Sequence, residues 1–346
     1  MIAVVLGTTG ELIKLAPVLR RLEGEYVLAT TAQQVTQIEP FLAELGLRPP
    51  DIWLARGAGG RDLESSGDVA RWLADVASGF HAHRRRLRQA DVVVVHGDTM
   101  TTLLGALMGR ALRRPVAHIE AGLRSGDLRN PFPEEAVRRV TSRLARVHYA
   151  PGPRAAATVA RRGRVIDTQW NTIRDALELV PDEPPPLELP KEPFGVVSLH
   201  RFELINDRRL FAATLDRLAG SPYPLLFVDH PVTAAALARF GLQAPGRIPR
   251  QRFFGWVQLL RRASFVVSDS GGAQEECYFL NVPCLVHRRR SERVEGFGET
   301  TLLSQLDVRV LESFLRDVPD LQRVGPVPAG SPSDLIVRDL LDRFPS

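Results

Sequence analysis

The 346-residue sequence has few cysteines and no long apolar run, and both absences exclude whole classes of protein. Its two cysteines, Cys277 and Cys284, lie in apolar stretches without metal-ligand spacing, so they indicate neither a disulfide framework nor a metal site. No apolar segment approaches the ~20 residues that a membrane-spanning helix needs. The chain begins directly with the strand-like segment Met1–Leu6, so we expect no signal peptide, no membrane partner and a cytoplasmic protein.

The chain is basic, but it lacks the pattern of a nucleic-acid-binding protein. It holds 45 Lys and Arg against 40 Asp and Glu, which gives a net charge of +5. The excess occurs in scattered arginine runs without interleaved aromatic residues, namely Arg84–Arg86, Arg161–Arg162 and Arg288–Arg290. We interpret most of these runs as solvated helix ends and expect no nucleic-acid partner.

Apolar, β-rich runs alternate with amphipathic helical stretches along almost the whole chain. The expected strands of the first half are Ile2–Leu6, Tyr26–Ala29, Asp91–His96, Pro115–Ile119 and Arg146–Ala150. Those of the second half are Phe194–Leu199, Pro224–Val228, Phe265–Val267 and Pro283–Val286. This alternation predicts the α/β class, with two similar doubly wound domains and a ligand-binding cleft between them.

A proline-rich segment, Pro181–Pro186, is the expected linker, because proline continues neither a helix nor a sheet interior. We place the N-terminal domain in residues 1–168 and the C-terminal domain in residues 169–331. The last stretch, about residues 332–346, has apolar side chains on one helical face. We expect this stretch to form a helix that packs back onto the first domain.

The most informative motif is Ser268–Glu276, which follows the apolar run Phe265–Val267. A strand, a Ser-Gly-Gly turn and a helix start are how open α/β sheets hold phosphate, because free N–H groups and the helix dipole attract anions there. The carboxylate of Glu276 lies where it can accept hydrogen bonds from ribose hydroxyls. The motif therefore indicates a nucleoside diphosphate with a sugar attached, although Gly-Gly before a helix is also common in simple tight turns.

Charged side chains follow several of the expected strands. Asp98, Glu120 and Glu134 lie at the ends of successive elements of the first domain, and clustered carboxylates of this kind supply an acid and a base. His200 and Arg201 end a strand of the second domain, where they can contact phosphate or move protons. Singly, each has a structural alternative, since Asp98 can cap a helix and Glu134 can stabilise a helix start.

Together these segments resemble the non-hydrolysing UDP-N-acetylglucosamine 2-epimerase family, in the same order and over nearly the whole chain. The matching motifs are His96–Thr99, His118–Arg124, Pro131–Glu135, Asn171–Leu177, His200–Arg201, Ser268–Glu276 and Glu292–Arg293. The resemblance implies two Rossmann-like domains with a central cleft, the glycosyltransferase-B type of fold. It also implies a UDP-sugar substrate, a homodimer, and no cofactor or metal.

The resemblance further implies a reaction in which UDP is eliminated and added back through a glycal-like intermediate, with inversion at C2 of the sugar. The catalytic residues that it implies are Asp98, Glu120, Glu134 and His200. The implied substrate- and UDP-binding residues are Gly7, Thr8, Lys14, Arg138, Arg201, Trp256, Ser270, Gly271, Gly272, Glu276 and Arg293. Trp256 aligns with an aromatic side chain against the uracil, and Glu276 with the ribose contact.

The chain also departs from the family pattern. Thr9 and Gly10 stand where an arginine and a proline are usual, so a cation that could steady the leaving diphosphate is missing. Gln33 and Gln34 stand in the loop of a second, regulatory substrate site, where Gln-His is usual. The other departures are Trp170, Phe202 and Val294. We expect a divergent member that acts on a related UDP-sugar or lacks substrate activation.

Three alternatives remain open from the sequence. A weakened hold on UDP would suit a hydrolysing 2-epimerase that releases UDP and N-acetylmannosamine. A glycosyltransferase of the same fold would need an acceptor and would not need three clustered carboxylates. A sugar-nucleotide-binding protein without catalytic activity would explain the missing cation in the first loop.

Overall fold

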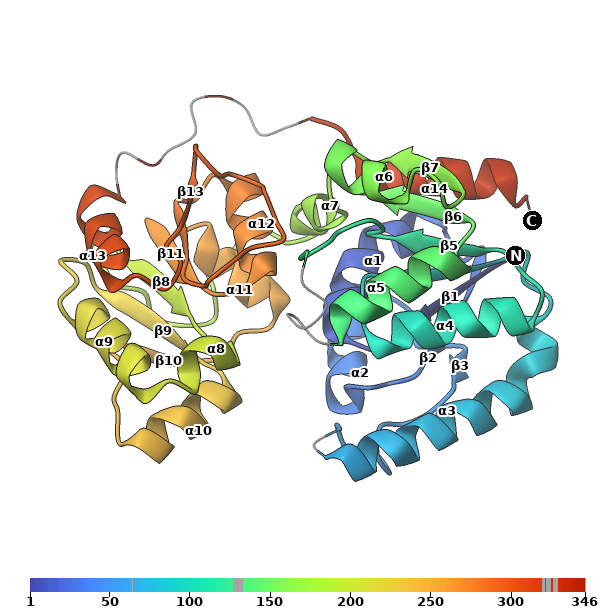
Figure 1. Ribbon diagram of the computed structural model, residues 1–346, viewed down its shortest axis with the longest axis horizontal. Coiled ribbons are helices and arrows are strands. Elements are labelled where there is room, and N and C mark those ends of the chain that lie inside the picture. The colour runs from blue at the N-terminus through green and yellow to red at the C-terminus, as the bar shows by residue number, and fades with distance from the viewer. Residues whose placement is uncertain (64, 127–132, 319–320, 322–324, 326–328, 346) are drawn as a thin grey trace. The chain divides into compact units, whose positions relative to one another are not determined.

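The chain forms two compact α/β units. The computed structural model describes residues 1–63, 65–126, 133–318, 321, 325 and 329–345. Unit 1 consists of Met1–Leu179 and Gly330–Ser346, and unit 2 of Val180–Ala329 (Figure 1). Each unit has one parallel sheet with helices around it, as the alternation of strands and helices in the sequence predicts.

Unit 1 is built on a seven-stranded parallel sheet with the order β3-β2-β1-β4-β5-β6-β7. Its strands are β1 Ile2–Leu6, β2 Tyr26–Thr30, β3 Ile52–Trp53, β4 Val92–His96, β5 Val116–Ile119, β6 Val147–Ala150 and β7 Arg164–Asp167. Neighbouring residues such as Val4 and Val5 are both buried, so the central strands are covered on both faces. This burial explains why β1 and β4 are continuously apolar.

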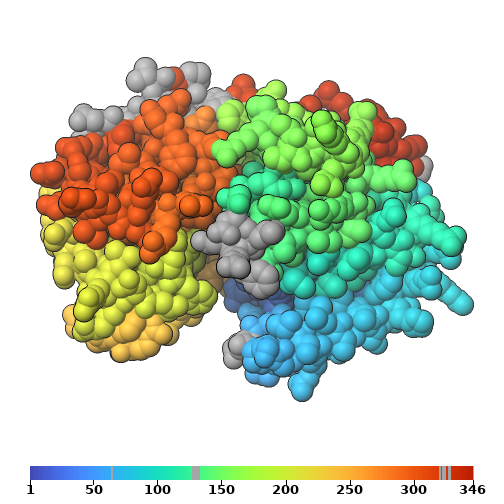
Figure 2. Space-filling model, in the orientation of Figure 1, coloured from blue at the N-terminus to red at the C-terminus, as the bar shows by residue number. Residues whose placement is uncertain are grey.

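Eight helices surround this sheet in the described part of unit 1. They are α1 Thr9–Arg21, α2 Val35–Glu44, α3 Ser66–Leu87, α4 Met100–Ala111, α5 Glu134–Leu144, α6 Pro153–Val159, α7 Ile173–Glu178 and α14 Pro332–Arg343. Side chains cap the starts of several of them, for example Ser65 before α3 and Thr99 before α4. The side chains of α3 form much of the light blue surface of unit 1 in Figure 2.

The C-terminal helix α14 belongs to unit 1, although unit 2 precedes it in the chain (Figure 1). It contacts α1 and α7, and its side chains Ile336 and Leu340 are buried. The first boundary of unit 1 lies at Leu179, later than the predicted boundary at residue 168. The reason is that α7 packs against α1, so the chain leaves unit 1 only after α7 and just before the proline-rich segment.

Unit 2 has a six-stranded parallel sheet with the order β10-β9-β8-β11-β12-β13. Its strands are β8 Gly195–Ser198, β9 Leu225–Asp229, β10 Arg247–Pro249, β11 Phe265–Ser268, β12 Cys284–Val286 and β13 Thr301–Leu303. Its helices are α8 Phe202–Ile205, α9 Arg208–Ala219, α10 Pro231–Phe240, α11 Phe253–Leu260, α12 Gly271–Leu280 and α13 Val308–Asp317.

Two hydrophobic clusters, one on each side of the sheet, form the core of unit 2. Phe227 and Phe265 pack with Phe211 of α9 on one side, and Val266 packs with Leu259 of α11 on the other. The two cysteines are free and buried, and Cys277 belongs to the second cluster. Among the residues that the structure describes, no helix is both long and apolar enough to cross a membrane.

Candidate active site

In each unit, the predicted site residues gather where the strand order of the sheet reverses. In unit 1 the reversal lies between β1 and β4, and in unit 2 between β8 and β11. Loops that leave the carboxyl ends of strands diverge at such a point and open a crevice, where ligands of open α/β sheets bind. Asp98 follows β4 and Glu120 follows β5, whereas His200 follows β8 and the Ser268–Glu276 motif begins at the end of β11.

Glu120 is the most constrained of the predicted catalytic residues. Its side chain is buried, and Lys14 Nζ donates to its Oε2 over 2.5 Å. Asn171 Nδ2 also donates to this oxygen, and His96 Nε2 lies 3.8 Å from it. The backbone of Glu120 is in the left-handed region with φ of +64°, which costs a non-glycine residue energy and is concentrated at functional sites. The predicted ligand Lys14 is thus a partner of the predicted catalytic carboxylate.

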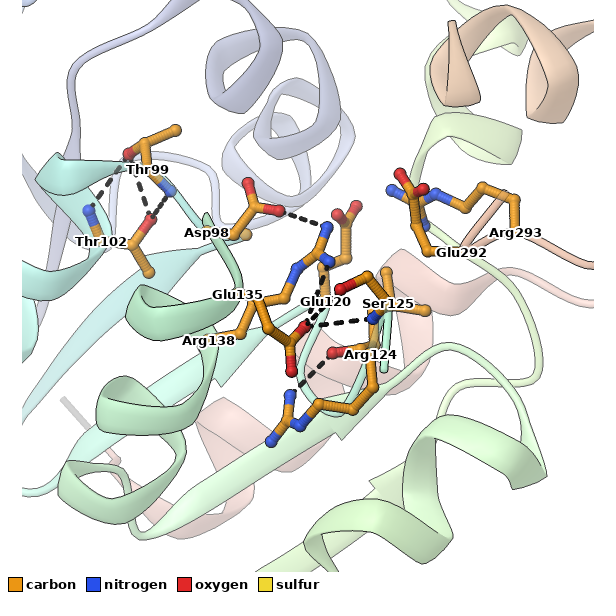
Figure 3. A network of polar contacts seen from close by, with 12 residues as sticks. Asp98, Thr99, Thr102, Glu120, Arg124, Ser125, Glu135, Arg138, Glu292 and Arg293 are labelled. Carbon is orange, nitrogen blue, oxygen red and sulfur yellow. Dashed lines mark hydrogen bonds and ion pairs between the residues drawn. The ribbon is translucent and has the colours of Figure 1, made fainter. Parts of the chain in front are cut away.

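Asp98 is half-buried and forms an ion pair with Arg138, another predicted substrate ligand. Figure 3 shows the guanidinium of Arg138 lying between the carboxylates of Asp98 and Glu135. Arg138 is itself 5% exposed, so its charge is largely removed from water and depends on these carboxylates. Asp98 is therefore held by a buried cation and does not act as the cap of α4, a role that Thr99 fills.

The two glutamates that begin α5 have different surroundings. Glu135 is fully buried and accepts the N–H of Ser125 over 3.1 Å (Figure 3). It also binds Arg139 Nε over 2.9 Å. Glu134, the predicted catalytic residue, is half-buried, and its Oε2 has no hydrogen-bond partner among the described residues. Glu135 thus fixes the backbone at Ser125, whereas Glu134 makes no such contact among the described residues. The motif residues Pro131 and Phe132 lie outside the described part of the chain.

The first loop of unit 1 directs its backbone N–H groups inward. Gly7 N and Thr8 N both donate over 2.9 Å to Oε2 of the buried Glu11, which closes a capping box at the start of α1. Thr9 N and its Oγ1 donate to Oε1 of Gln34. Burial raises the pKa of Glu11, against the hydrogen bonds that favour its ionised form. Gly7 and Thr8, both predicted UDP ligands, therefore have no backbone N–H left for phosphate in this arrangement.

The predicted phosphate turn has the geometry of a helix N-terminus in unit 2. Ser270 is the N-cap of α12, and its Oγ accepts from Ala273 N. Gly271 and Gly272 form the first turn of the helix, where backbone N–H groups have no intrahelical acceptor. A Cβ at Gly271 would lie 3.2 Å from Glu292 Oε1, so glycine allows the Glu292 side chain to approach the turn.

Trp256 and Glu276, predicted to contact uracil and ribose, are hydrogen-bonded to each other. Trp256 Nε1 on α11 donates to Glu276 Oε2 on α12 over 2.6 Å. Both side chains are half-buried. This hydrogen bond therefore fixes the orientation of the Glu276 carboxylate and holds the Trp256 ring beside that carboxylate.

A buried charged network surrounds the phosphate turn. Arg288 Nη2 binds Glu292 Oε2 over 2.8 Å, and the predicted ligand Arg293 binds Glu275 Oε1 over 2.9 Å. Burial raises the pKa of Glu292, but the positive charges of Arg288 and Arg293 outweigh burial and hold this pKa at about 2. Glu292 is therefore ionised at neutral pH. The network places two arginines beside the turn with one carboxylate for each.

His200, the predicted catalytic residue of unit 2, lies against the buried Asp269. Its backbone N–H and that of Arg201 donate to Asp269 Oδ2 over 2.8 and 2.7 Å. The side chain of the predicted ligand Arg201 donates from Nε to the backbone oxygen of Asp269. Burial lowers the pKa of His200 to about 4, so its imidazole is neutral at pH 7.

A cavity of about 460 Å³ lies at the opposite, amino-terminal edge of the sheet of unit 1. The cavity is lined by Pro115, Val116 and Leu144 and by four arginines, namely Arg110, Arg113, Arg114 and Arg146. These arginines lie at or just beyond the C-terminal ends of α4 and α5, where cations stabilise the helix dipoles. None of the predicted site residues lines this cavity. No group of three potential metal ligands occurs among the described residues.

Two Rossmann-like units with polar loops at their reversal points define an α/β protein of the glycosyltransferase-B type. The family model for UDP-N-acetylglucosamine 2-epimerase matches residues 19–310. The chain belongs to this family, which is a family of isomerases.

Individual relatives match most of the chain. The UDP-N-acetylglucosamine 2-epimerase of Yersinia pestis is 31% identical, covering 86% of this chain and 85% of its own. The Escherichia coli enzyme of the same name is 30% identical over 91% of this chain and 90% of its own. The UDP-GlcNAc 2-epimerase of Methanocaldococcus jannaschii, solved with UDP-GlcNAc and UDP, superposes with a TM-score of 0.81 at 26% identity. This match covers 99% of each chain.

The structure adds residues that sequence reasoning did not select for the site. Asp269, Glu135 and Glu11 each hold a loop that carries a predicted site residue. Asp269 directly follows a buried strand, which is the signal that identified Asp98 and Glu120, so the same rule applied to β11 would have found it. Nothing in the sequence distinguishes Glu135 from Glu134, because only the direction of each side chain on α5 separates them.

Proposed function

We propose that this chain interconverts UDP-N-acetylglucosamine, or a related UDP-2-acetamido sugar, with its C2 epimer by a non-hydrolysing route. A carboxylate removes the proton from C2, and the C1–O bond breaks so that UDP leaves with the bonding electrons. A glycal-like intermediate remains. Delivery of a proton to the opposite face of C2 and return of UDP to C1 complete the epimerisation. Membership of the family supports this assignment.

The surroundings of Glu120 are the structural observation that carries the proposal. A general base must be held in position, and the buried ion pair with Lys14 and the hydrogen bond from Asn171 hold this carboxylate in place. Asp98 and Glu134 are the other two members of the proposed acid–base set. The ion pair of Asp98 with Arg138 holds this carboxylate in position in the same way.

Unit 2 is proposed to hold the UDP part of the substrate. The turn of Ser270, Gly271 and Gly272 offers N–H groups to a phosphate, and the dipole of α12 adds to the attraction. Glu276, oriented by Trp256, would accept hydrogen bonds from the ribose. His200 and Arg201 are proposed to lie near the departing diphosphate, with Arg293 as a further phosphate contact.

Solvent deuterium uptake at C2 tests the proposed chemistry directly. The protein is incubated with UDP-N-acetylglucosamine in D2O, and the sugar is followed by proton NMR. We expect loss of the C2 proton signal together with a UDP-N-acetylmannosamine signal. Absence of exchange with every UDP-2-acetamido sugar would exclude proton abstraction and with it the proposed function.

A hydrolysing reaction is the second candidate, and the first loop of unit 1 favours it. The backbone N–H groups of Gly7, Thr8 and Thr9 are bonded to Glu11 and Gln34, and no arginine stands in this loop. A weaker hold on UDP in unit 1 would let water add to the intermediate. The same NMR experiment separates the two reactions, because hydrolysis releases free N-acetylmannosamine and UDP.

The glycosyltransferase alternative makes a different prediction for Glu120. Transfer to an acceptor does not require removal of the C2 proton, so Glu120→Gln would leave most of the activity.

The family resemblance underlies our proposal of a homodimer, and the cytoplasmic location is proposed from the sequence alone. Analytical ultracentrifugation at assay concentrations tests the dimer.

A further inference from the structure

Asp269 connects the two loops that flank the reversal point of unit 2. It is 0% exposed, and its Oδ2 accepts the backbone N–H groups of His200 and Arg201. Its own backbone N–H donates to Ser198 at the end of β8, and its backbone oxygen accepts from Arg201 Nε. One oxygen of the carboxylate is therefore fully used in fixing the backbone of the loop after β8.

The other oxygen of Asp269 faces the imidazole of His200. Asp269 Oδ1 lies 3.3 Å from His200 Nδ1, and neither atom has a hydrogen-bond partner among the described residues. An ionised carboxylate only accepts hydrogen bonds, whereas a neutral imidazole has one N–H and one acceptor nitrogen. The contact therefore favours the tautomer with the proton on Nδ1, which leaves a lone pair on Nε2.

The charge states of both groups agree with this contact at neutral pH. Burial lowers the pKa of His200 to about 4, and Arg201 and Arg250 add to the effect. Burial raises the pKa of Asp269 to about 6, against the hydrogen bonds from Arg201 and His200. At pH 7 a neutral imidazole thus lies beside a carboxylate.

A second histidine limits the rotation of the His200 ring. The rings of His200 and His230 are 4.6 Å apart between centroids and tilted by 39°. His230 Nε2 lies 3.0 Å from Ser198 Oγ, and burial lowers the pKa of His230 to about 4. The His200 ring is therefore held by a carboxylate at Nδ1 and by a neutral ring beside it.

We propose that Asp269 is a positioning residue that holds His200 as the Nδ1–H tautomer and presents an unprotonated Nε2 at the reversal point of unit 2. The inference rests on the proposed function and specifies how His200 serves it. In this state Nε2 accepts a hydrogen bond and does not donate one to the diphosphate. The negative charge of the diphosphate is then stabilised by other donors, such as the N–H groups at the start of α12.

The substitution Asp269→Asn tests the tautomer without removing the backbone contacts. The amide oxygen replaces Oδ2 and still accepts the N–H groups of His200 and Arg201. The amide NH2 replaces Oδ1 and donates to Nδ1, so the imidazole proton moves to Nε2. In both proteins, 15N-histidine-labelled full chain at pH 7.5 is examined by NMR, and the His200 signals are assigned by their absence in His200→Gln.

We expect Nδ1–H in the parent and Nε2–H in Asp269→Asn. We also expect kcat for epimerisation to fall roughly 10³-fold to 10⁴-fold with little change in KM, as a wrong histidine tautomer costs in other enzymes. The matched control is Asp175→Asn in unit 1, where a buried aspartate accepts the N–H of Ser333 over 2.7 Å. This control should leave the His200 tautomer unchanged.

Nε2–H in the parent overturns the proposal by itself, even if Asp269→Asn does not fold. An unchanged tautomer in a folded Asp269→Asn overturns it as well. The tautomer measurement needs no turnover, so the proposed function can fail separately. Reversal of the tautomer in a protein that exchanges no C2 proton would support the role of Asp269 and reject the epimerase reaction.

Discussion

At the scale of single residues, adjacent glutamates on one helix have different surroundings. Glu135 is fully buried and joins Ser125 to Arg139, whereas Glu134 is half-buried with a free oxygen among the described residues. A buried carboxylate that loses its charge leaves its donors without a full partner. A carboxylate that contacts a substrate affects turnover instead. We therefore propose that Glu134 serves catalysis and that Glu135 serves stability.

We predict that the two glutamine variants affect different properties of the protein. Glu134→Gln should slow C2 proton exchange by about 10²-fold to 10⁴-fold, the usual contribution of a general acid or base, and leave thermal stability unchanged. Glu135→Gln should lower the free energy of unfolding by about 1–3 kcal/mol, because Arg138 and Arg139 lose a charged partner. Exchange is measured by NMR and stability by urea unfolding. A stable Glu135→Gln with slow exchange would reverse the assignment.

The buried Asp269 also makes a prediction for the dependence of stability on pH. Its pKa is raised from 3.8 to about 6, so its stabilising contribution is complete below pH 3.8 and is lost as the pH rises through 6. The parent should lose about 3 kcal/mol relative to Asp269→Asn between pH 4 and pH 7, at roughly 1.4 kcal/mol per pKa unit. Urea unfolding of both proteins at each pH measures this. A constant difference would show that Asp269 has an ordinary pKa.

At the scale of elements, the turn between β1 and α1 depends on glycine at one position only. A Cβ at Gly7 would lie 2.2 Å from Thr101 Oγ1 and 2.3 Å from Thr31 Oγ1. These two hydroxyls are hydrogen-bonded to each other over 2.7 Å, so neither can move without loss. Gly10, three residues later in α1, has nothing within 4 Å of its Cβ position.

The two glycines form a matched pair of alanine variants. Gly7→Ala should destabilise unit 1 by about 1–3 kcal/mol, the usual cost of overpacking a buried site. Gly10→Ala should stabilise it by about 0.5–1 kcal/mol, because alanine is the better helix former and the site is open. Chemical denaturation of each variant measures both values. Equal effects of the same sign would mean that the contacts around Gly7 relax at little cost.

The elements that the sequence predicted are the buried ones. Apolar runs such as Val92–His96 form central strands, because a strand covered on both faces must be apolar throughout. The strands that were not predicted are short edge strands with mixed or exposed residues, namely β3, β7, β10 and β13. The candidate site, too, could be predicted only in part from the sequence. Strand ends located Asp98 and Glu120, and the Thr-x-x-Glu spacing of Thr8 and Glu11 is that of a capping box. That spacing does not reveal that Gly7 N also donates to Glu11.

At the scale of the whole molecule, unit 1 is discontinuous and unit 2 is not. The chain completes unit 1 only when α14 returns to it after residue 329. Several contacts of α14 are polar, including Tyr149 Oη to Asp339 over 2.9 Å and Ser333 N to Asp175 over 2.7 Å. Its apolar contribution comes from buried side chains such as Leu340, at 0% exposure. The stability of unit 1 therefore depends on the last helix of the chain.

Neighbouring leucines of α14 allow this dependence to be measured. Leu340 is 0% exposed and Leu341 is 36% exposed, so the two positions differ in burial within one helix. Leu340→Ala should destabilise unit 1 by about 2–5 kcal/mol, whereas Leu341→Ala should change it by less than about 0.5 kcal/mol. Hydrogen exchange followed by mass spectrometry resolves the units, because each peptide belongs to one of them. Leu340→Ala should speed exchange in peptides from residues 1–179, and peptides from residues 180–329 should keep their protection. Equal loss of protection in both ranges would show that the two units unfold together.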